Sequence, residues 1–354
     1  MPSALVVGGG VFGAALADQL VGRDWSVRLV EQFAPGDPRS ESGGETRLLR
    51  YSHGPDSFYA ASAWRSRDTW RELGVLEEVG LVCFARRSEG WEAESLETLR
   101  ALDIPAERLS PGEAARLYPS LRTDDLAFAL LEPDAGVLRA SDGVHALVTR
   151  AQAGGLRLDQ RVVHPNDPFE ADHVIWACGA WLGQLFPSLV QLRITRQELV
   201  LFDAGPDWEG TPGWLDFDAS GYGHGLIEPY GIKVASDREG AEVEPGLRPP
   251  SAPDESLTAA REYLAHRFPA LASAPIRSSP SCHYSLTADG NFLFARHPER
   301  DNVWLLGGGS GHGYKHGPAL AQHAAEVLEG KAAPEPRFGL GERPPSRAFR
   351  TAGS

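Results

Sequence analysis

The sequence predicts an α/β fold in which a Rossmann-like dinucleotide-binding domain is interrupted by a second domain. Three short apolar runs of strand type, at residues 4–7, 174–177 and 302–306, each lead into glycine or a glycine-containing turn. Strands that end in glycine at the edge of a parallel sheet are typical of nucleotide-binding α/β domains. A chain of 354 residues, 42% of them hydrophobic, is long enough for two domains or for one domain inserted into another.

The N-terminal run carries the fullest pattern. ALVV (4–7) is followed by GGGVFG (8–13), by apolar residues at helical spacing, and by a second apolar run, VRLV (27–30), that ends at Glu31. The glycines let the backbone approach a pyrophosphate at a helix N-terminus, and Glu31 can accept hydrogen bonds from ribose hydroxyls. An acid at this place suits either NAD or FAD. The candidate cofactor contacts in this segment are Gly8, Gly10, Val11, Phe12, Gly13 and Glu31.

The two later runs extend the same arrangement. VIWA (174–177) leads into CGAW (178–181), and NVWLL (302–306) leads into three glycines. If the three strands are parallel in one sheet, their carboxyl ends share the edge at which open α/β sheets bind ligands. The dinucleotide-binding domain is then discontinuous. We expect it to comprise residues 1–78, 138–190 and 282–354, with the second domain formed by residues 79–137 and 191–281.

The composition of the chain limits the kinds of molecule that the protein is expected to bind. The formal charge of −14 disfavours nucleic acid, whose phosphates need a basic face. No apolar run reaches the roughly 18 residues that a membrane span needs, and no leader pattern is seen, so we expect a cytoplasmic protein. The three cysteines, Cys83, Cys178 and Cys282, lack the close spacing of a zinc site, and their odd number favours a reduced compartment. No metal site is expected.

Three further blocks give a family resemblance. They are SGGETRLLRY (42–51), CHYSLTAD (282–289) and SGHGYK (310–315). Together with the glycine fingerprint and CGAW, they resemble the amine oxidase branch of the D-amino-acid-oxidase-like flavoproteins, nearest to monomeric sarcosine oxidase and N-methyltryptophan oxidase. The resemblance runs in order through almost the whole chain.

The resemblance implies FAD as the cofactor and an α+β second domain, built on a mixed sheet, that binds the substrate. It also implies oxidation of the C–N bond of a small amino acid, usually a secondary or N-methyl amine, to an imine. The partners are then a substrate carrying a carboxylate and molecular oxygen, which leaves as hydrogen peroxide. We expect a monomer or a weak homo-oligomer.

The family's cationic residues match positions in this chain. Arg50 matches the arginine that binds the substrate carboxylate, for which a forked guanidinium is well suited. Lys315 matches the lysine that assists it. Lys233 matches the lysine over the flavin that promotes reaction with oxygen, by stabilising the negative charge that develops there. Only three lysines occur in the chain, and the third, Lys331, lies in a Pro-rich stretch and is expected at the surface.

Other site residues follow from the same resemblance. Cys282 matches the cysteine whose sulfur is bonded to the flavin 8-methyl group, and His312, Tyr222 and Tyr284 are expected to line the substrate side of the flavin. Asp237 departs from the histidine that sarcosine oxidases have four residues after the lysine, which favours a substrate with an additional cationic or donor group. The remaining candidate cofactor contacts are Gly44, Thr46, Arg47, Gly179, Trp181, Gly309, Gly311, Gly313 and Lys315. Arg47 alternatively serves as a structural ion-pair partner.

Other classes of function fit the sequence less well than an FAD-dependent amine oxidase. A serine hydrolase would need glycine at residue 312 to complete G-x-S-x-G, and this chain has histidine there. An NAD-dependent dehydrogenase or a nucleotide-binding regulatory protein leaves the Cys282 block and the two lysines unexplained. A flavin-dependent dehydrogenase that passes electrons to another acceptor is the nearer rival, and Lys233 favours the oxidase.

Overall fold

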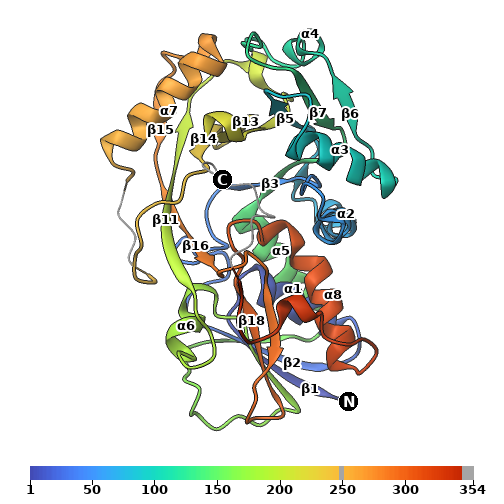
Figure 1. The fold of residues 1–354 in the computed structure, drawn as a ribbon. Helices are drawn as coiled ribbons and strands as arrows, with labels where there is room; N and C mark the ends of the chain where they lie inside the picture. The colour runs from blue at the N-terminus through green and yellow to red at the C-terminus, as the bar shows by residue number, and fades with distance from the viewer. Residues whose placement is uncertain (247–250, 345–354) are drawn as a thin grey trace.

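The computed structural model describes residues 1–246 and 251–344. The chain builds one lobe on a largely parallel sheet and a second lobe on a mixed sheet, and the long strand β11 (Arg193–Phe202) extends from one lobe into the other (Figure 1). The expected combination of a Rossmann-like domain and a mixed-sheet domain is confirmed by this architecture.

The first sheet has six strands in the order β17-β18-β10-β1-β2-β9. Its members are β1 (Ser3–Val7), β2 (Ser26–Glu31), β9 (Arg157–Gln160), β10 (His173–Trp176), β17 (Leu293–Arg296) and β18 (Val303–Gly307). All neighbouring pairs are parallel except β17 with β18. The three glycine-ended runs form β1, β10 and β18, which are adjacent and parallel as the sequence predicts.

Helices cover both faces of this sheet. On one face, α1 (Val11–Val21) packs against α5 (Ala140–Ala153) and α8 (Gly317–Leu328), and α2 (Ser57–Glu72) lies on α8. On the other face, the short helix α6 (Leu182–Leu185) and the aromatic rings of Trp176 and Phe186 form a smaller core. These two apolar layers bury the sheet and leave its carboxyl edge for a ligand.

The second sheet has nine strands, in the order β15-β11-β14-β13-β12-β5-β7-β6, with β16 paired to the other half of β11. Its strands besides β11 are β5 (Leu81–Ala85), β6 (Glu107–Leu109), β7 (Phe128–Glu132), β12 (Gly213–Asp216), β13 (Gly221–Ile227), β14 (Gly231–Ser236), β15 (Ile276–Ser278) and β16 (Ser281–Leu286). β12 and β5 are parallel and the other neighbours are antiparallel. This is the mixed sheet that the family resemblance implies.

The remaining elements complete the second lobe and its junction with the first. α3 (Trp91–Ala101), α4 (Pro111–Ala115) and α7 (Asp254–Arg267) pack on the nine-stranded sheet, and β3 (Thr46–Leu49), β8 (Gly136–Arg139) and β4 (Leu76–Glu77) form a small third sheet. The domain limits stay a prediction. Those at 138 and 282 fall inside β8 and β16, and residues 247–250 and 345–354 of the predicted ranges lie outside the described residues.

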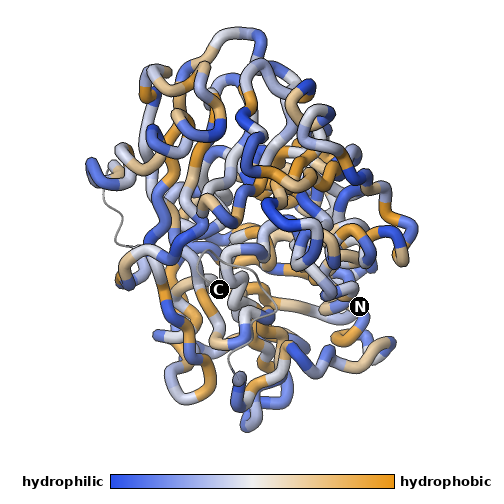
Figure 2. Tube along the Cα trace, turned by 45° about the horizontal axis from the view of Figure 1, so that its top comes forward, coloured by the Kyte–Doolittle hydropathy of each residue, from blue (hydrophilic) through white to orange (hydrophobic). Residues whose placement is uncertain are grey.

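Hydrophobic residues are distributed in short stretches. Along the trace, they alternate with hydrophilic segments over the whole chain (Figure 2). Among residues 1–246 and 251–344, no helix combines the length and the apolar character that crossing a bilayer requires.

A buried ion pair holds the second lobe together. Arg267, at the end of α7, donates to Asp216 at the end of β12 with an Nε–Oδ2 distance of 2.7 Å, and neither side chain is exposed. Arg267 also donates to Asp125 at 2.7 Å. Because β12 runs directly into the turn before β13, this pair fixes the start of a strand that reaches the candidate site.

We predict that Arg267→Met lowers the free energy of unfolding by about 3–5 kcal/mol, because it leaves the Asp216 carboxylate buried without its partner. The measurement is denaturant unfolding followed by fluorescence. Arg277→Met is the control, since Arg277 pairs with Asp203 near the surface, and its loss is expected to cost less than about 1 kcal/mol. Equal losses in the two variants would contradict the prediction.

Candidate functional site

One cavity of about 470 Å³ lies where the two sheets meet. Its wall includes the carboxyl ends of β1, β2, β10 and β18 from the first sheet, and parts of β11, β13, β14 and β16 from the second. Segments that are distant in the sequence therefore share one cavity.

The turn between β1 and α1 forms one part of the wall, and only glycine fits there. A Cβ added at Gly8, whose φ is +104°, would lie 2.3 Å from the Ala177 carbonyl oxygen at the end of β10. A Cβ at Gly13 would lie 1.9 Å from the Gly8 carbonyl oxygen. Gly8, Gly10, Val11 and Phe12 line the cavity, whereas Gly13 is a packing residue behind them. The glycines bring strand and helix close together at the edge of the cavity.

Glu31 braces this turn from the end of β2. Its carboxylate accepts from the Gly9 amide at 2.5 Å and from the Phe33 amide at 2.9 Å. Burial raises the pKa of Glu31, and these two amides act in the opposite direction. The Ser42 hydroxyl accepts from the Val11 amide at 2.8 Å, so the segment after β2 also supports the turn. Glu31 lines the cavity, and its contact with a ribose stays a prediction.

The turns after β10 and β18 contribute the other glycines at the carboxyl edge of the first sheet. Gly179 and Trp181 line the cavity, and the Trp181 ring lies edge-on to Phe33 with a centroid distance of 6.1 Å. Gly309, Gly311 and Gly313 line it as well. Gly311 has a φ of +73°, and a Cβ there would lie 2.9 Å from the Tyr284 ring, so glycine is required for that ring to pack.

Backbone carbonyls in and beside the 42–51 block accept hydrogen bonds from side chains of the site. The sequence does not predict these contacts. Arg47 lines the cavity, but its guanidinium also donates to the carbonyls of Thr46, Glu41 and Gly43 at 2.7–2.9 Å, which fixes the loop. Thr46 is not on the wall. Its hydroxyl bonds the His224 ring at 2.8 Å, and its carbonyl accepts from Lys233. Gly44 is also off the wall and has a φ of +91°.

Lys233 lies in the middle of β14 with 3% of its surface exposed. Its ammonium donates to the Thr46 carbonyl at 3.1 Å and lies 5.6 Å from the centre of the Tyr222 ring. Burial lowers the pKa of Lys233 to about 8, and Arg47 adds to this effect. The Lys233 charge is thus held on the cavity wall by a neutral carbonyl.

Cys282 and Lys233 face the same side of the sheet. Cys282 pairs with Gln197 of β11, and Lys233 pairs with Leu201, four residues further along the same strand. Directly paired residues of neighbouring strands point to the same face, and so do residues an even number apart on one strand. Cys282 is 9% exposed and lines the cavity, where a flavin bonded to its sulfur would lie.

Two tyrosines of the second sheet are hydrogen bonded to each other on the cavity wall. The hydroxyls of Tyr222 on β13 and Tyr284 on β16 are 3.1 Å apart and hydrogen bonded. Burial raises the pKa of both phenols, so both stay neutral donors at physiological pH. Both rings line the cavity, and their place on the substrate side of a flavin stays a prediction.

Arg50 and Lys315 place two further cations on the wall. Arg50 donates to the Ser52 carbonyl and lies 5.7 Å from the Trp91 ring centre, and Lys315 donates to the His312 carbonyl at 2.9 Å. Burial lowers the pKa of Lys315 well below its usual value, and Arg50 adds to the effect. Among the described residues, Arg50, Lys315 and Lys233 form no ion pair with a carboxylate. The charge of the buried Glu132 acts on Arg50 and Lys315 from further away and opposes the lowering of their pKa by burial.

The structure adds wall residues that the sequence did not single out. Ser42, whose hydroxyl accepts from the Val11 amide, lies directly before Gly43 and Gly44. His53 follows Arg50 by three residues. Trp91 and Phe217 come from the second lobe and pack edge-on with a centroid distance of 5.1 Å. Ser42 belongs to the 42–51 block but is not among the expected contacts, and no sequence motif marks the other three residues, because each reaches the wall through tertiary packing. Asp237 also lines the cavity.

Comparisons with known proteins agree with this geometry. A family model described as DAO, FAD dependent oxidoreductase, matches residues 3–327. The chain is 30% identical over 357 residues to a monomeric sarcosine oxidase of Streptomyces avermitilis, covering 91% of this chain and 92% of that protein. It is 22% identical over 365 residues to an N-methyl-L-tryptophan oxidase of Yersinia pestis, covering 93% and 95%.

Solved structures show the same fold. A modified fructosyl peptide oxidase from Aspergillus nidulans aligns with a TM-score of 0.86 at 18% identity, covering 99% of this chain and 96% of that one. The L-proline dehydrogenase from P. horikoshii aligns with a TM-score of 0.85 at 20% identity, covering 96% of each chain.

The cavity suits the cofactor that this family uses. It extends from Glu31 and the glycine turn, where an adenine dinucleotide would be held, to Lys233 and Cys282 on the second sheet. The close packing at Gly8 leaves no room for a side chain at that point of the edge. The family model spans most of the chain, and the predicted resemblance is confirmed. The chain belongs to the FAD-dependent oxidoreductase family.

Proposed function

We propose that this protein oxidises the C–N bond of a small amino acid, a secondary or N-methyl amine, to an imine and passes the electrons to molecular oxygen, which yields hydrogen peroxide. The observation that carries this proposal is the set of three cations on one cavity wall, the buried Lys315 and Lys233 and the half-buried Arg50, none of which forms an ion pair with a carboxylate in the described part of the chain. The sarcosine and N-methyltryptophan oxidases among its relatives support the same reaction class.

Arg50 and Lys315 form the proposed carboxylate site. Taking a cation out of water costs free energy unless an anion or a set of dipoles replaces the water. Each of the two has one backbone carbonyl as acceptor, which leaves donor hydrogens for a ligand. A substrate carboxylate that accepts from both groups would be held with its amine directed further into the cavity.

FAD supplies the redox chemistry when bound, because it accepts two electrons from the amine and transfers them to oxygen. Lys233 is the residue that we assign to the oxygen step. Its ammonium is fixed by the Thr46 carbonyl, so a positive charge is already in place where dioxygen becomes negative. Tyr222 and Tyr284 hold the neighbouring wall as neutral groups, and the Cys282 sulfur is our proposed covalent attachment point for FAD.

Asp237 restricts the substrate that we propose. Its carboxylate is on the wall of the same cavity, beyond the end of β14. A carboxylate disfavours a second anion and favours a hydrogen-bond donor or a cation. We therefore propose a substrate with one carboxylate and a further donor or cationic group, in place of sarcosine itself. A cytoplasmic location and a monomeric or weakly oligomeric state remain our predictions.

An FAD-dependent dehydrogenase is the second candidate. The fold is shared with an L-proline dehydrogenase, so the architecture is compatible with both. The buried Lys233 favours an oxidase. The deciding experiment is to mix the purified yellow protein with a panel of N-methyl, cyclic and basic amino acids and to assay hydrogen peroxide. Flavin reduction by a substrate without peroxide under air would support the dehydrogenase, and no flavin reduction by any amine would contradict both candidates.

For the carboxylate site, we predict that Arg50→Ala weakens binding of simple carboxylates such as acetate by about 10- to 100-fold, because charged hydrogen bonds of about 1.5–3 kcal/mol are lost. The measurement is titration of the flavin absorption spectrum. Arg296→Ala is the control, since Arg296 pairs with Asp301 at the surface. Unchanged affinity in a correctly folded, flavin-containing Arg50→Ala protein would contradict the assignment.

For the oxygen step, we predict that Lys233→Met slows reoxidation of the reduced protein by oxygen about 10²- to 10³-fold, with little change in reduction by substrate. Reoxidation by the unaltered protein should slow as the pH rises through about 8, because Lys233 then loses its proton. Stopped-flow absorbance measures both. The variant should lack this pH dependence, and Lys331→Met, which removes an exposed lysine, should retain it.

For the cofactor linkage, we predict that acid-precipitated unaltered protein keeps its flavin in the pellet, whereas Cys282→Ser releases all of it, because serine cannot form the thioether. Cys178→Ser is the matched control, as Cys178 also lines the cavity. The absorbance of the supernatant is measured. Release of flavin by the unaltered protein would show that Cys282 is not the attachment point.

A further inference from the structure

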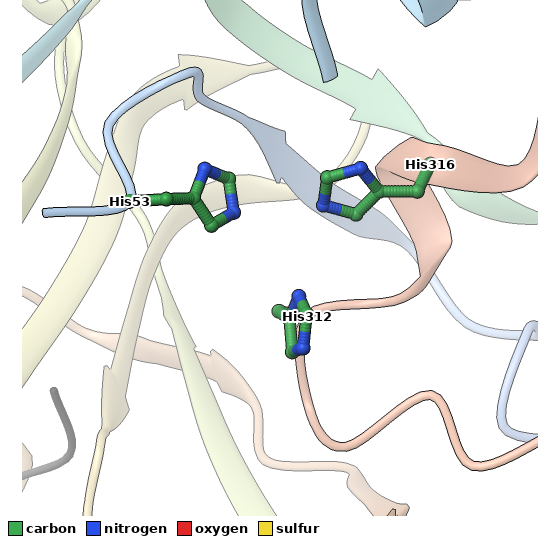
Figure 3. A group of neighbouring side chains, drawn as sticks. All are labelled: His53, His312 and His316. Carbon is green, nitrogen blue, oxygen red and sulfur yellow. The ribbon is translucent and has the colours of Figure 1, made fainter. Parts of the chain in front are cut away.

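Three histidines, His53 and two from the segment that precedes α8, form a cluster beside the cavity in which His53 and His316 are buried and His312 is half-buried. His53 follows β3, His312 lies in the loop after β18, and His316 immediately precedes α8. One nitrogen of each ring points toward a common centre (Figure 3), and three such ring atoms lie within 4.8 Å of one another. The rings of Tyr59 and Phe292 pack around the cluster at centroid distances of 4.8–5.9 Å.

Backbone carbonyls fix the outer nitrogens of two of these rings. His53 Nδ1 is 2.9 Å from the Tyr51 carbonyl, and His312 Nε2 is 3.0 Å from the Gly290 carbonyl. A carbonyl only accepts, so both of these nitrogens carry the hydrogen and donate it. The inward nitrogens, His53 Nε2 and His312 Nδ1, are then unprotonated lone pairs. This is the arrangement in which metal-binding histidines are usually oriented.

The inward nitrogens of His53 and His316 have no protein partner among the described residues. His53 is 3% exposed and His316 is 0% exposed, and neither Nε2 has a hydrogen-bond partner. His316 Nδ1 is 3.0 Å from the Ser62 hydroxyl. Burying an unpaired ring nitrogen costs about 1–3 kcal/mol, so two convergent cases indicate a bound group at the centre.

The cluster is kept neutral, which ligand histidines require. Burial lowers the pKa of all three rings well below the usual value, and Lys315 and Arg50 add to the effect. The same two cations oppose a dication at the centre, so the remaining coordination position should hold an anion or a water. That position is available because His53 and His312 also line the cavity.

We propose that His53 Nε2, His312 Nδ1 and His316 Nε2 bind one divalent transition-metal ion of the zinc type, with a fourth position open to the cavity. Three atoms within 4.8 Å of one another share a centre at most about 2.8 Å away, so the rings must close by less than about 1 Å to reach the zinc–nitrogen distance of about 2.0–2.1 Å. Imidazole nitrogens suit Zn²⁺ and its neighbours in the transition series.

This site goes beyond the proposed function and does not depend on it. The sequence predicts no metal site, because its cysteines lack zinc spacing, whereas the cluster is made of histidines up to 263 positions apart. Its closest pair, His312 and His316, lies in the same SGHGYKH segment that supplies Lys315.

The experiment uses the tag-free, flavin-containing protein after dialysis against chelator. Zn²⁺ is added, and bound metal is measured by equilibrium dialysis with elemental analysis. We expect one ion per chain. Adding Co²⁺ instead should give visible absorption bands at wavelengths longer than the flavin absorption, as expected for a low-symmetry site with nitrogen ligands. This spectrum tests the proposal on the unaltered protein alone.

His316→Phe keeps an aromatic ring in the cluster but removes one ligand, and should lower the affinity for Zn²⁺ by more than about 10- to 100-fold. His323→Phe is the matched control, because His323 lies on α8 outside the cluster and packs near Phe294 and Phe338. No Zn²⁺ uptake and no Co²⁺ bands in the unaltered protein would overturn the proposal and leave a water at the centre. Equal Zn²⁺ affinity in the two variants would also overturn it, since the ion would then lie elsewhere.

Discussion

The close approach of β1, β10 and α1 is the contact on which the rest of the site depends. At Gly8, the backbone passes so near the Ala177 carbonyl that even a methyl group would overlap it, and Gly13 presses α1 against the same turn. This packing sets three parallel strand ends on one edge. Glu31 and Ser42 then hold the turn through the Gly9 and Val11 amides. The cofactor edge is therefore a property of backbone packing, which side chains reinforce.

The electrostatics of the cavity contrast with those of the whole protein. The chain carries a formal charge of −14, yet Arg50, Lys315 and Lys233 bring positive charge to one enclosed wall. Each is held by a backbone carbonyl, so its charge is oriented without being neutralised. The acidic exterior gives no general attraction for anions, and selection of an anionic substrate has to come from these local groups.

Much of the fold and part of the site could be predicted from the sequence. The glycine-ended runs indicated three strands that could be parallel in one sheet, since that signal is local, whereas their order comes from the structure. Lys233, which the resemblance singled out, is buried in β14. Of the predicted cofactor contacts, Gly13, Gly44 and Thr46 are not on the cavity wall.

The remainder depends on contacts between distant segments. The spacing of residues in the sequence does not reveal that Lys233 donates to the Thr46 carbonyl instead of the Thr46 side chain. It also does not reveal that Arg47 donates to three carbonyls of its own loop. His53 gave no signal, because its cluster exists only when β3, the loop after β18 and the start of α8 come together. Local patterns identify turns and strands, whereas the partners of individual polar atoms are set by tertiary packing.

The continuity of β11 has a mechanical consequence. Its first half is hydrogen bonded to β16 beside Cys282, and its second half to β14 beside Lys233, with the two positions roughly 13 Å apart along the strand. One continuous strand thus fixes the separation between the backbone positions that carry the two side chains. A change in this separation would require breaking the backbone hydrogen bonds that β11 makes with β14 or β16, so the positions of thiol and ammonium along the cavity are coupled through one strand.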